Sequence, residues 1–176
     1  LIEVIRNVVR SRDFATLEQL ENTDFDEPPR SLRNDYRILL IGHRQALIKQ
    51  LCNRLELNCY LDDKDYSRQE NINRKEQYGV CLDSLWKVQG RVYDLVIIDE
   101  SEQVLAHLLS ETVKNRETVF QLLKHTVSSA KNVVALDADL GWTTYQALTR
   151  FRKIETPYDS NKNRVWIIIN EYIPSN

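Results

Sequence analysis

The sequence predicts an α/β protein whose mainly parallel sheet is covered by helices on both faces, giving three layers. Short apolar runs alternate along the chain with segments whose apolar residues recur at helical spacing. These runs show no polar alternation, which is typical of strands buried on both faces of a parallel sheet. The 176 residues, 42% of them hydrophobic and 28% charged, suffice for one domain with a sizeable core.

The first quarter of the chain predicts a helix, a loop, a strand and a second helix. Residues 1–21 place apolar side chains at helical spacing, and the polar segment 22–35 contains two adjacent prolines, which favours a surface loop. The run YRILLIG at 36–42 is continuously apolar and too short for a helix, so we expect a strand. Leucines at helical spacing in 43–57 then predict a helix.

The middle of the chain predicts two further strands separated by a polar stretch. NCYL at 58–61 is a candidate short strand, and the polar stretch 62–76 follows it. YGVCL at 78–82 is typical of a strand, and SLWKV at 84–88 indicates a short helical turn or loop.

The remainder of the chain continues the alternation. We expect a strand at 93–99, two helices within 100–129, a strand at 132–137, a helix at 141–151 and two further strands at 152–158 and 163–172.

Composition excludes several classes of function. The net charge of −2 gives no global field for a polyanion, so any contact with nucleic acid must come from a local basic face. No apolar stretch reaches the roughly 20 residues of a membrane span, and no signal peptide opens the chain. The cysteines are three, scattered and without CxxC spacing, so we expect reduced, buried thiols in a cytoplasmic protein.

Two absences bear on chemistry. The chain starts at Leu1 and contains no methionine, so we expect a piece of a longer polypeptide. Its four glycines never match GxxxxGK[ST], the loop that cradles nucleotide phosphates.

Two predicted strands end in acidic residues. Asp99 closes the run DLVIID with Glu100 directly after it, and Asp137 and Asp139 follow the run VVAL. Ligands of parallel sheets bind at the carboxyl ends of the strands, where paired carboxylates suit Mg²⁺ and an attacking water. A structural alternative is equally open for Glu100, because acids also favour the first turn of a helix, and Asp139 could cap the next helix.

Four strings, in order, resemble the motor domain of superfamily 2 helicases. They are LLIGHRQALIKQLCNRL, GVCLDSLWKV, VIIDESEQVLAHLLSETVKNR and VVALDADLGWTTYQALTRF, covering about residues 36–142. The nearest groups are the origin-binding replication helicases of the herpesvirus type and the large plasmid replication proteins of the cyanobacterial type. The resemblance implies that 1–176 is one RecA-like lobe, the first of two, from a protein that replicates an origin, plasmid or phage.

The resemblance also implies roles for individual residues. Asp99 would hold Mg²⁺ and Glu100 would activate water, with Asp137, Asp139 and Gln103 coupling nucleotide state to the DNA track. His43, Arg44 and Ser84 would touch the DNA backbone. Since the phosphate loop is missing, ATP and Mg²⁺ are expected in the intact protein, with no tight binding and no ATP hydrolysis by this chain alone. The expected partners are DNA and a second helicase lobe, and no membrane.

Other readings of the same residues remain open. The whole chain could be a non-catalytic scaffold derived from a motor lobe, and a two-metal nuclease is a more distant alternative. Arg44 could simply solvate a helix start, Gln103 could be an ordinary surface residue, and Asp83 is expected to cap its turn. For Trp86 and Trp142, packing in the core is favoured over stacking on a base.

Overall fold

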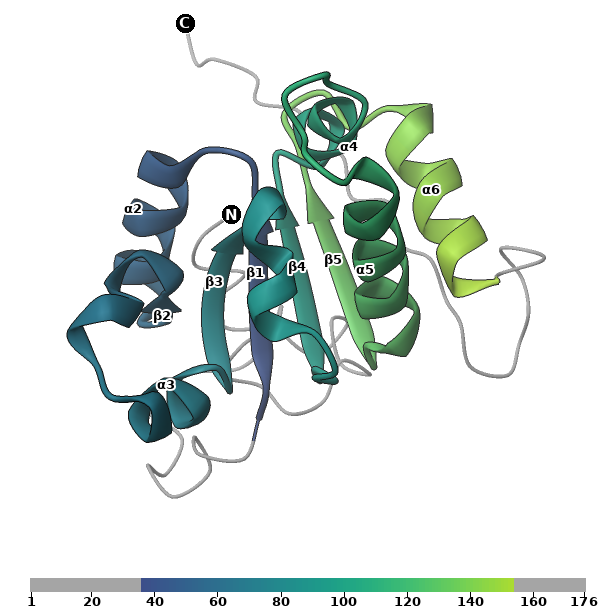
Figure 1. Cartoon of the computed structure of the whole chain (residues 1–176). Helices are drawn as coiled ribbons and strands as arrows, with labels where there is room; N and C mark the ends of the chain where they lie inside the picture. Colours follow the sequence, from purple (N-terminus) through teal and green to yellow (C-terminus); the bar gives the residue numbers. More distant parts are fainter. Residues whose placement is uncertain (1–35, 154–176) are drawn as a thin grey trace, which may run out of the picture.

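All five strands of the sheet run parallel, in the order β2-β3-β1-β4-β5 (Figure 1). The computed structural model describes residues 36–153, and the helix, loop and strand expected at 1–21, 22–35 and 163–172 lie outside them. The strands are β1 (Ile38–Gly42), β2 (Asn58–Cys59), β3 (Gln77–Cys81), β4 (Leu95–Asp99) and β5 (Asn132–Leu136). The five strands predicted within this range are therefore confirmed.

Helices connect successive strands, as the alternating pattern predicts. They are the α-helices α2 (Gln45–Leu55), α3 (Arg68–Arg74), α4 (Ser101–Leu108), α5 (Arg116–Ser129) and α6 (Trp142–Arg152), and the 3-10 helices η3 (Tyr60–Asp65) and η4 (Leu82–Val88). Arg152 ends α6, so the strand expected at 152–158 does not begin there, and its remaining residues from 154 lie outside the described range.

The central strands β1 and β4 form the core because, apart from Asp99 at the end of β4, no residue on either face is polar. All five residues of β1 are buried, as are the first four of β4. Burying the side chain of a leucine or isoleucine contributes roughly 1.5–3 kcal/mol. Cys52, Cys59 and Cys81 are buried and free, as expected for structural thiols.

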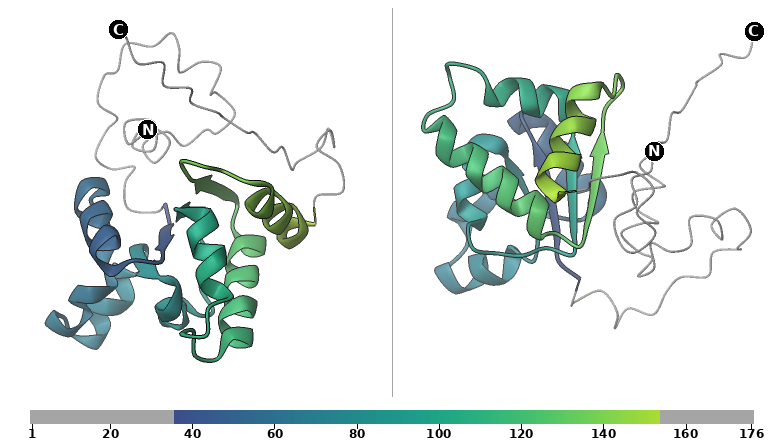
Figure 2. Two further views of the ribbon diagram at one scale, coloured as in Figure 1. Left: turned by 90° about the horizontal axis from the view of Figure 1, so that it is seen from above. Right: turned by 90° about the vertical axis from the view of Figure 1, so that its right-hand side faces the viewer.

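The two faces of the sheet are covered by different helices. From β1 the chain crosses β3 to reach β2, and then moves in the opposite direction through β3 and β4 to β5. Because such crossovers are right-handed, α2 covers one face, and η4, α4 and α5 cover the other, giving the three layers of a RecA-like α/β fold. Figure 2 shows α4 and α5 on one side of the sheet seen edge-on.

Neighbouring residues of β3 contact the elements on the two opposite faces of the sheet. A Cβ added to Gly79 would lie 2.2 Å from the Cys52 sulfur, so only glycine lets α2 approach this closely. The adjacent Tyr78 points the other way, and its hydroxyl donates to Asp63 at 2.7 Å. Asp63 in turn pairs with Lys87 of η4 at 2.6 Å.

The structure contains one helix that the sequence did not predict, and the expected core packing of two tryptophans is wrong. The polar stretch 62–76 contains α3, which buries no residue and is held at its start by a capping box between Ser67 and Glu70. Trp86 and Trp142 are not core residues but are 62% and 67% exposed. Within the described residues, no helix has both the length and the apolar character to cross a membrane.

Candidate functional site

The acidic ends of β4 and β5 lie side by side at the carboxyl edge of the sheet. Asp99 pairs in register with Leu136, so Asp137 follows directly beside it. Burial raises the pKa of Asp99, and the negative charges of Glu100 and Asp137 raise it further. Three carboxylates therefore crowd one edge, as the sequence predicted from strand ends alone.

Glu100 occupies a strained backbone conformation at this edge. Its φ of 50° and ψ of 56° lie in the left-handed region, although it is not glycine. Its Oε2 atom is buried and has no hydrogen-bond partner among the described residues. Such strain costs on the order of 1–3 kcal/mol and is found most often at functional sites. Glu100 is the N-cap residue of α4 and Glu102 lies in its first turn, as the helix-start alternative predicts, but the Glu100 side chain makes no capping bond.

The carboxylate of Asp137 binds backbone amides. Its Oδ2 accepts from the Glu102 N–H at 2.9 Å and its Oδ1 accepts from the Asp139 N–H at 3.0 Å. Asp137 thus satisfies an orphan N–H in the first turn of α4. It connects β5 to the helix that follows the other acidic strand end.

Glu102 connects α4 to α6. Its Oε1 accepts from the N–H groups of Gly141 at 2.9 Å and Thr144 at 3.0 Å, at the start of α6. Burial raises the pKa of Glu102, but the hydrogen bonds from Thr144 and Gly141 outweigh it and lower the pKa overall. The hydroxyl of buried Thr144 also donates to Ser101 at 3.2 Å. Asp137 and Glu102 therefore join the two acidic segments into one unit.

A second chain of polar contacts starts at Glu100 and ends in solvent. His43 follows β1 directly, and its Nδ1 lies 3.4 Å from the buried Glu100 Oε2. Arg44 is exposed, and its Nε donates to the His43 Nε2 at 3.0 Å. Burial lowers the pKa of His43, with the charge of Arg44 lowering it further and that of Glu100 raising it. The lowered pKa favours the neutral form of the imidazole.

His43 and Glu100 meet at the topological switch point of the sheet. Strands β1 and β4 are neighbours, and the chain leaves them in opposite directions, from β1 towards β2 and from β4 towards β5. Connections that diverge in this way leave a crevice at the carboxyl ends of the two strands, where open α/β sheets bind ligands. The contact between Glu100 and His43 spans that position.

η4 carries two more of the residues considered in the sequence, Asp83 and Ser84. The sequence predicted that Asp83 caps its turn. Its carboxylate instead contacts the His107 Nε2 of α4 at 3.0 Å. Ser84 is partly buried beside the Tyr60 phenol. The His107 ring lies 6.4 Å from that of His43, so α4 links η4 to the end of β1.

Two predicted residues stand apart from these contacts. Gln103 is exposed on α4 and Asp139 is exposed before α6. Within residues 36–153, no group of three or more His, Cys, Asp or Glu side chains is arranged to hold a metal ion. A divalent cation at this edge would therefore need oxygen ligands from a substrate in addition to Asp99.

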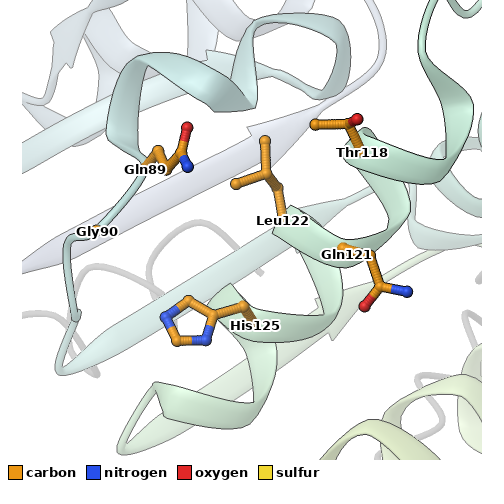
Figure 3. Close-up of a pocket in the computed structure, with 6 residues that line it drawn as sticks. All are labelled: Gln89, Gly90, Thr118, Gln121, Leu122 and His125. Atoms are coloured by element: carbon orange, nitrogen blue, oxygen red, sulfur yellow. The ribbon is translucent and has the colours of Figure 1, made fainter.

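A separate groove lies between α5 and the segment after η4 (Figure 3). It is lined by Gln89, Gly90, Thr118, Gln121, Leu122 and His125. None of the residues that the sequence singled out for chemistry lies in it, so the candidate site is the carboxyl edge and not this groove.

Sequence reasoning missed Glu102, His107 and Asp83 as parts of the site. The spacing of DESE shows that Glu102 lies near the edge, but its bond to α6 joins segments 39 residues apart. No local pattern indicates such a bond. His107 lies two helical turns after Glu100, which places it near the same edge once α4 is assumed.

The fold defines a RecA-like parallel α/β protein with an acidic carboxyl edge, and the comparison with known proteins shows its family. Residues 30–175 match the family described as "Origin of replication binding protein". The chain belongs to this family. Over 135 residues, covering 68% of the chain, it is 30% identical to the "Putative replication origin-binding protein" of Acanthamoeba polyphaga mimivirus.

Two further relatives carry related names. The "Uncharacterized putative helicase R8" of the same mimivirus is 29% identical over 76% of the chain. The "Replication origin-binding protein" of Psittacid herpesvirus 1 is 21% identical over 79% of the chain. The matched regions span 17%, 13% and 16% of these three proteins, so the chain corresponds to a small part of each.

Proposed function

We propose that this chain is part of the first motor lobe of an ATP-dependent DNA helicase or translocase of superfamily 2 that acts in origin, plasmid or phage replication. The family supports the link to replication origins. A mimivirus relative named as a helicase supports a motor. The proposal includes a second motor lobe and the ATP-dependent activity of the whole protein.

The observation that carries the proposal is the crowding of Asp99, Glu100 and Asp137 at one carboxyl edge. Like charges raise the pKa of Asp99, and a divalent cation beside it would relieve that repulsion. Hard Mg²⁺ is commonly held by one or two carboxylates together with substrate phosphates. The residues present therefore fit Mg²⁺ bound with a nucleotide better than Mg²⁺ bound alone.

Asp99 would hold the cation and Glu100 would orient and deprotonate the attacking water. When bound with ATP, Mg²⁺ would neutralise charge that develops on the phosphates. The sequence has no GxxxxGK[ST] string, so other residues of the full-length gene product would cradle the phosphates. The strained backbone of Glu100 leaves its carboxylate without a capping bond to α4, which suits a group that acts on a substrate.

The DNA side of the proposal rests on the loops after β1 and β3. Arg44 is exposed beside His43 and would contact a DNA phosphate, as would Ser84 of η4. Asp137 and Asp139 would transmit nucleotide state, since Asp137 connects β5 to α4 through the Glu102 N–H. Gln103 would act at the exposed surface of α4.

The test is DNA-stimulated ATP hydrolysis by the full-length gene product. We expect Glu100→Gln to lower kcat by about 10²–10⁴, the range of a general base, because the amide cannot take the proton of water. Glu111→Gln, at an exposed position just after α4, is the matched control and should leave kcat unchanged. Undiminished turnover in Glu100→Gln would remove Glu100 from the mechanism. Absence of ATP hydrolysis by the wild-type protein would favour the scaffold alternative.

A further inference from the structure

Three side chains lie in contact along the acidic edge. Glu100 has one buried oxygen although its side chain is 40% exposed, the His43 side chain is 13% exposed, and Arg44 is exposed. The atoms that join them are Glu100 Oε2 to His43 Nδ1 at 3.4 Å, and His43 Nε2 to Arg44 Nε at 3.0 Å. One imidazole therefore contacts both the proposed catalytic carboxylate and the proposed DNA-binding cation.

The partners of His43 fix its tautomer. Arg44 Nε can only donate, so the His43 Nε2 must accept and carries no proton. The proton of the neutral ring is then on Nδ1, which faces the Glu100 oxygen that has no other hydrogen-bond partner among the described residues. At 3.4 Å this contact is longer than an ordinary N–H···O bond, so a small shift of either side chain completes it.

The surroundings of the ring favour this arrangement. Burial and the neighbouring Arg44 and His107 lower the pKa of His43, and the neutral form is the one that can accept from Arg44. His107, the other ring nearby, is itself bonded to Asp83 through Nε2. Within residues 36–153, Glu100 is thus the carboxylate that faces His43, and Arg44 donates the hydrogen bond that the ring accepts.

We propose that His43 is a positioning residue that couples DNA binding to the orientation of Glu100. The inference rests on the proposed function. A phosphate bound by the terminal guanidinium nitrogens of Arg44 would leave its Nε free to hold the His43 Nε2, and would immobilise the side chain. The ring is then fixed with Nδ1–H towards Glu100. DNA would thereby align the carboxylate that activates water.

The experiment measures ATP hydrolysis by the full-length gene product without DNA and at saturating DNA. We expect His43→Phe to lower the ratio of DNA-stimulated to basal kcat at least about fivefold, the lower end of coupling between sites. Phenylalanine keeps the ring but neither donates nor accepts. The KM for ATP should stay close to that of the wild type, since His43 acts through Glu100 and not on the nucleotide.

Two further variants separate the halves of the contact. His43→Asn is short and retains a donor for Glu100 without reaching Arg44, whereas His43→Gln reaches Arg44 with an acceptor. Both should lose stimulation, because coupling needs both contacts. Gln45→Ala, exposed at the first residue of α2, is the matched control and should keep the wild-type ratio. Melting temperatures show that each variant folds, and His43→Asn replaces His43→Phe if the latter does not.

The outcomes distinguish this inference from the function on which it rests. A reduced ratio in the His43 variants, with the control unchanged, supports the inference. A wild-type protein with DNA-stimulated ATP hydrolysis and His43 variants that keep its ratio would overturn the inference alone. A wild-type protein without DNA-stimulated ATP hydrolysis would overturn both.

Discussion

Asp99 shows at the scale of one residue how a site can oppose stability. Its pKa is raised above the ordinary value of 3.8, first by burial and then by the charges of Glu100 and Asp137. A carboxyl group with a raised folded pKa contributes stability below its unfolded pKa and loses it as the pH rises through the folded pKa. At neutral pH the ionised Asp99 therefore destabilises the fold.

We predict that Asp99→Asn raises the melting temperature of this chain at pH 7 by a few degrees, because the amide removes the buried charge and its repulsion. The gain should shrink as the pH falls through the raised folded pKa towards 3.8, because Asp99 is then protonated in the folded state. Thermal unfolding followed by circular dichroism at several pH values measures both effects. Asp139→Asn, at an exposed position, is the control. An equal or lower melting temperature for Asp99→Asn at pH 7 would contradict the linkage argument.

Single residues also show where sequence reasoning stops. The sequence predicts that Asp99 and Asp137 are neighbours, because each lies at the end of a strand and parallel strands share one carboxyl edge. The exposure of Trp142 does not follow, because its ring lies on Tyr145 at 4.8 Å and not on the core. Helical spacing places a residue on a face, but which neighbour covers that face depends on the packing of distant segments.

At the scale of secondary-structure elements, Glu102 holds α4 and α6 together. One carboxylate oxygen accepts two N–H groups at the start of α6, satisfying two of that helix's orphan donors. Its pKa is lowered overall, so its contribution to stability is present above its ordinary value of 4.5 and is lost as the pH falls through the lower folded pKa.

We predict that Glu102→Ala lowers the free energy of unfolding by about 1–2 kcal/mol, the cost of removing a helix cap. Glu102→Gln should lose less, because its amide oxygen still accepts. Chemical denaturation at pH 7 measures the change, with Gln103→Ala, exposed on the same helix, as the control. Equal stability of Glu102→Ala and the wild type would show that α6 does not depend on this cap.

α3 illustrates an element that the sequence contains but that apolar periodicity cannot predict. No residue of α3 is buried, so no apolar stripe marks it. The signal that was present is the string SRQE, in which Ser67 and Glu70 form the capping box. The strands, by contrast, were predictable, since burial on both faces requires continuous apolar runs.

At the scale of the whole molecule, charge decides how DNA could bind. The chain carries a net charge of −2, and three carboxylates crowd the edge that we propose as the nucleotide site. Long-range attraction between this chain and DNA is therefore weak, and contact must rest on individual cations such as Arg44. Each phosphate contact releases counterions and contributes a fixed share to the dependence of affinity on salt.

We predict that Arg44→Ala in the full-length gene product weakens DNA binding and lowers the slope of log K against log salt concentration by about 1, the share of one phosphate contact. The loss should be similar for different DNA sequences, because a phosphate contact carries no sequence information. Fluorescence anisotropy with labelled DNA at several salt concentrations measures the slope. Lys124→Ala, exposed on α5, removes the same charge elsewhere and should leave the slope unchanged. An unchanged slope in Arg44→Ala would place the DNA on another surface, and coupling through His43 would then have no DNA contact to transmit.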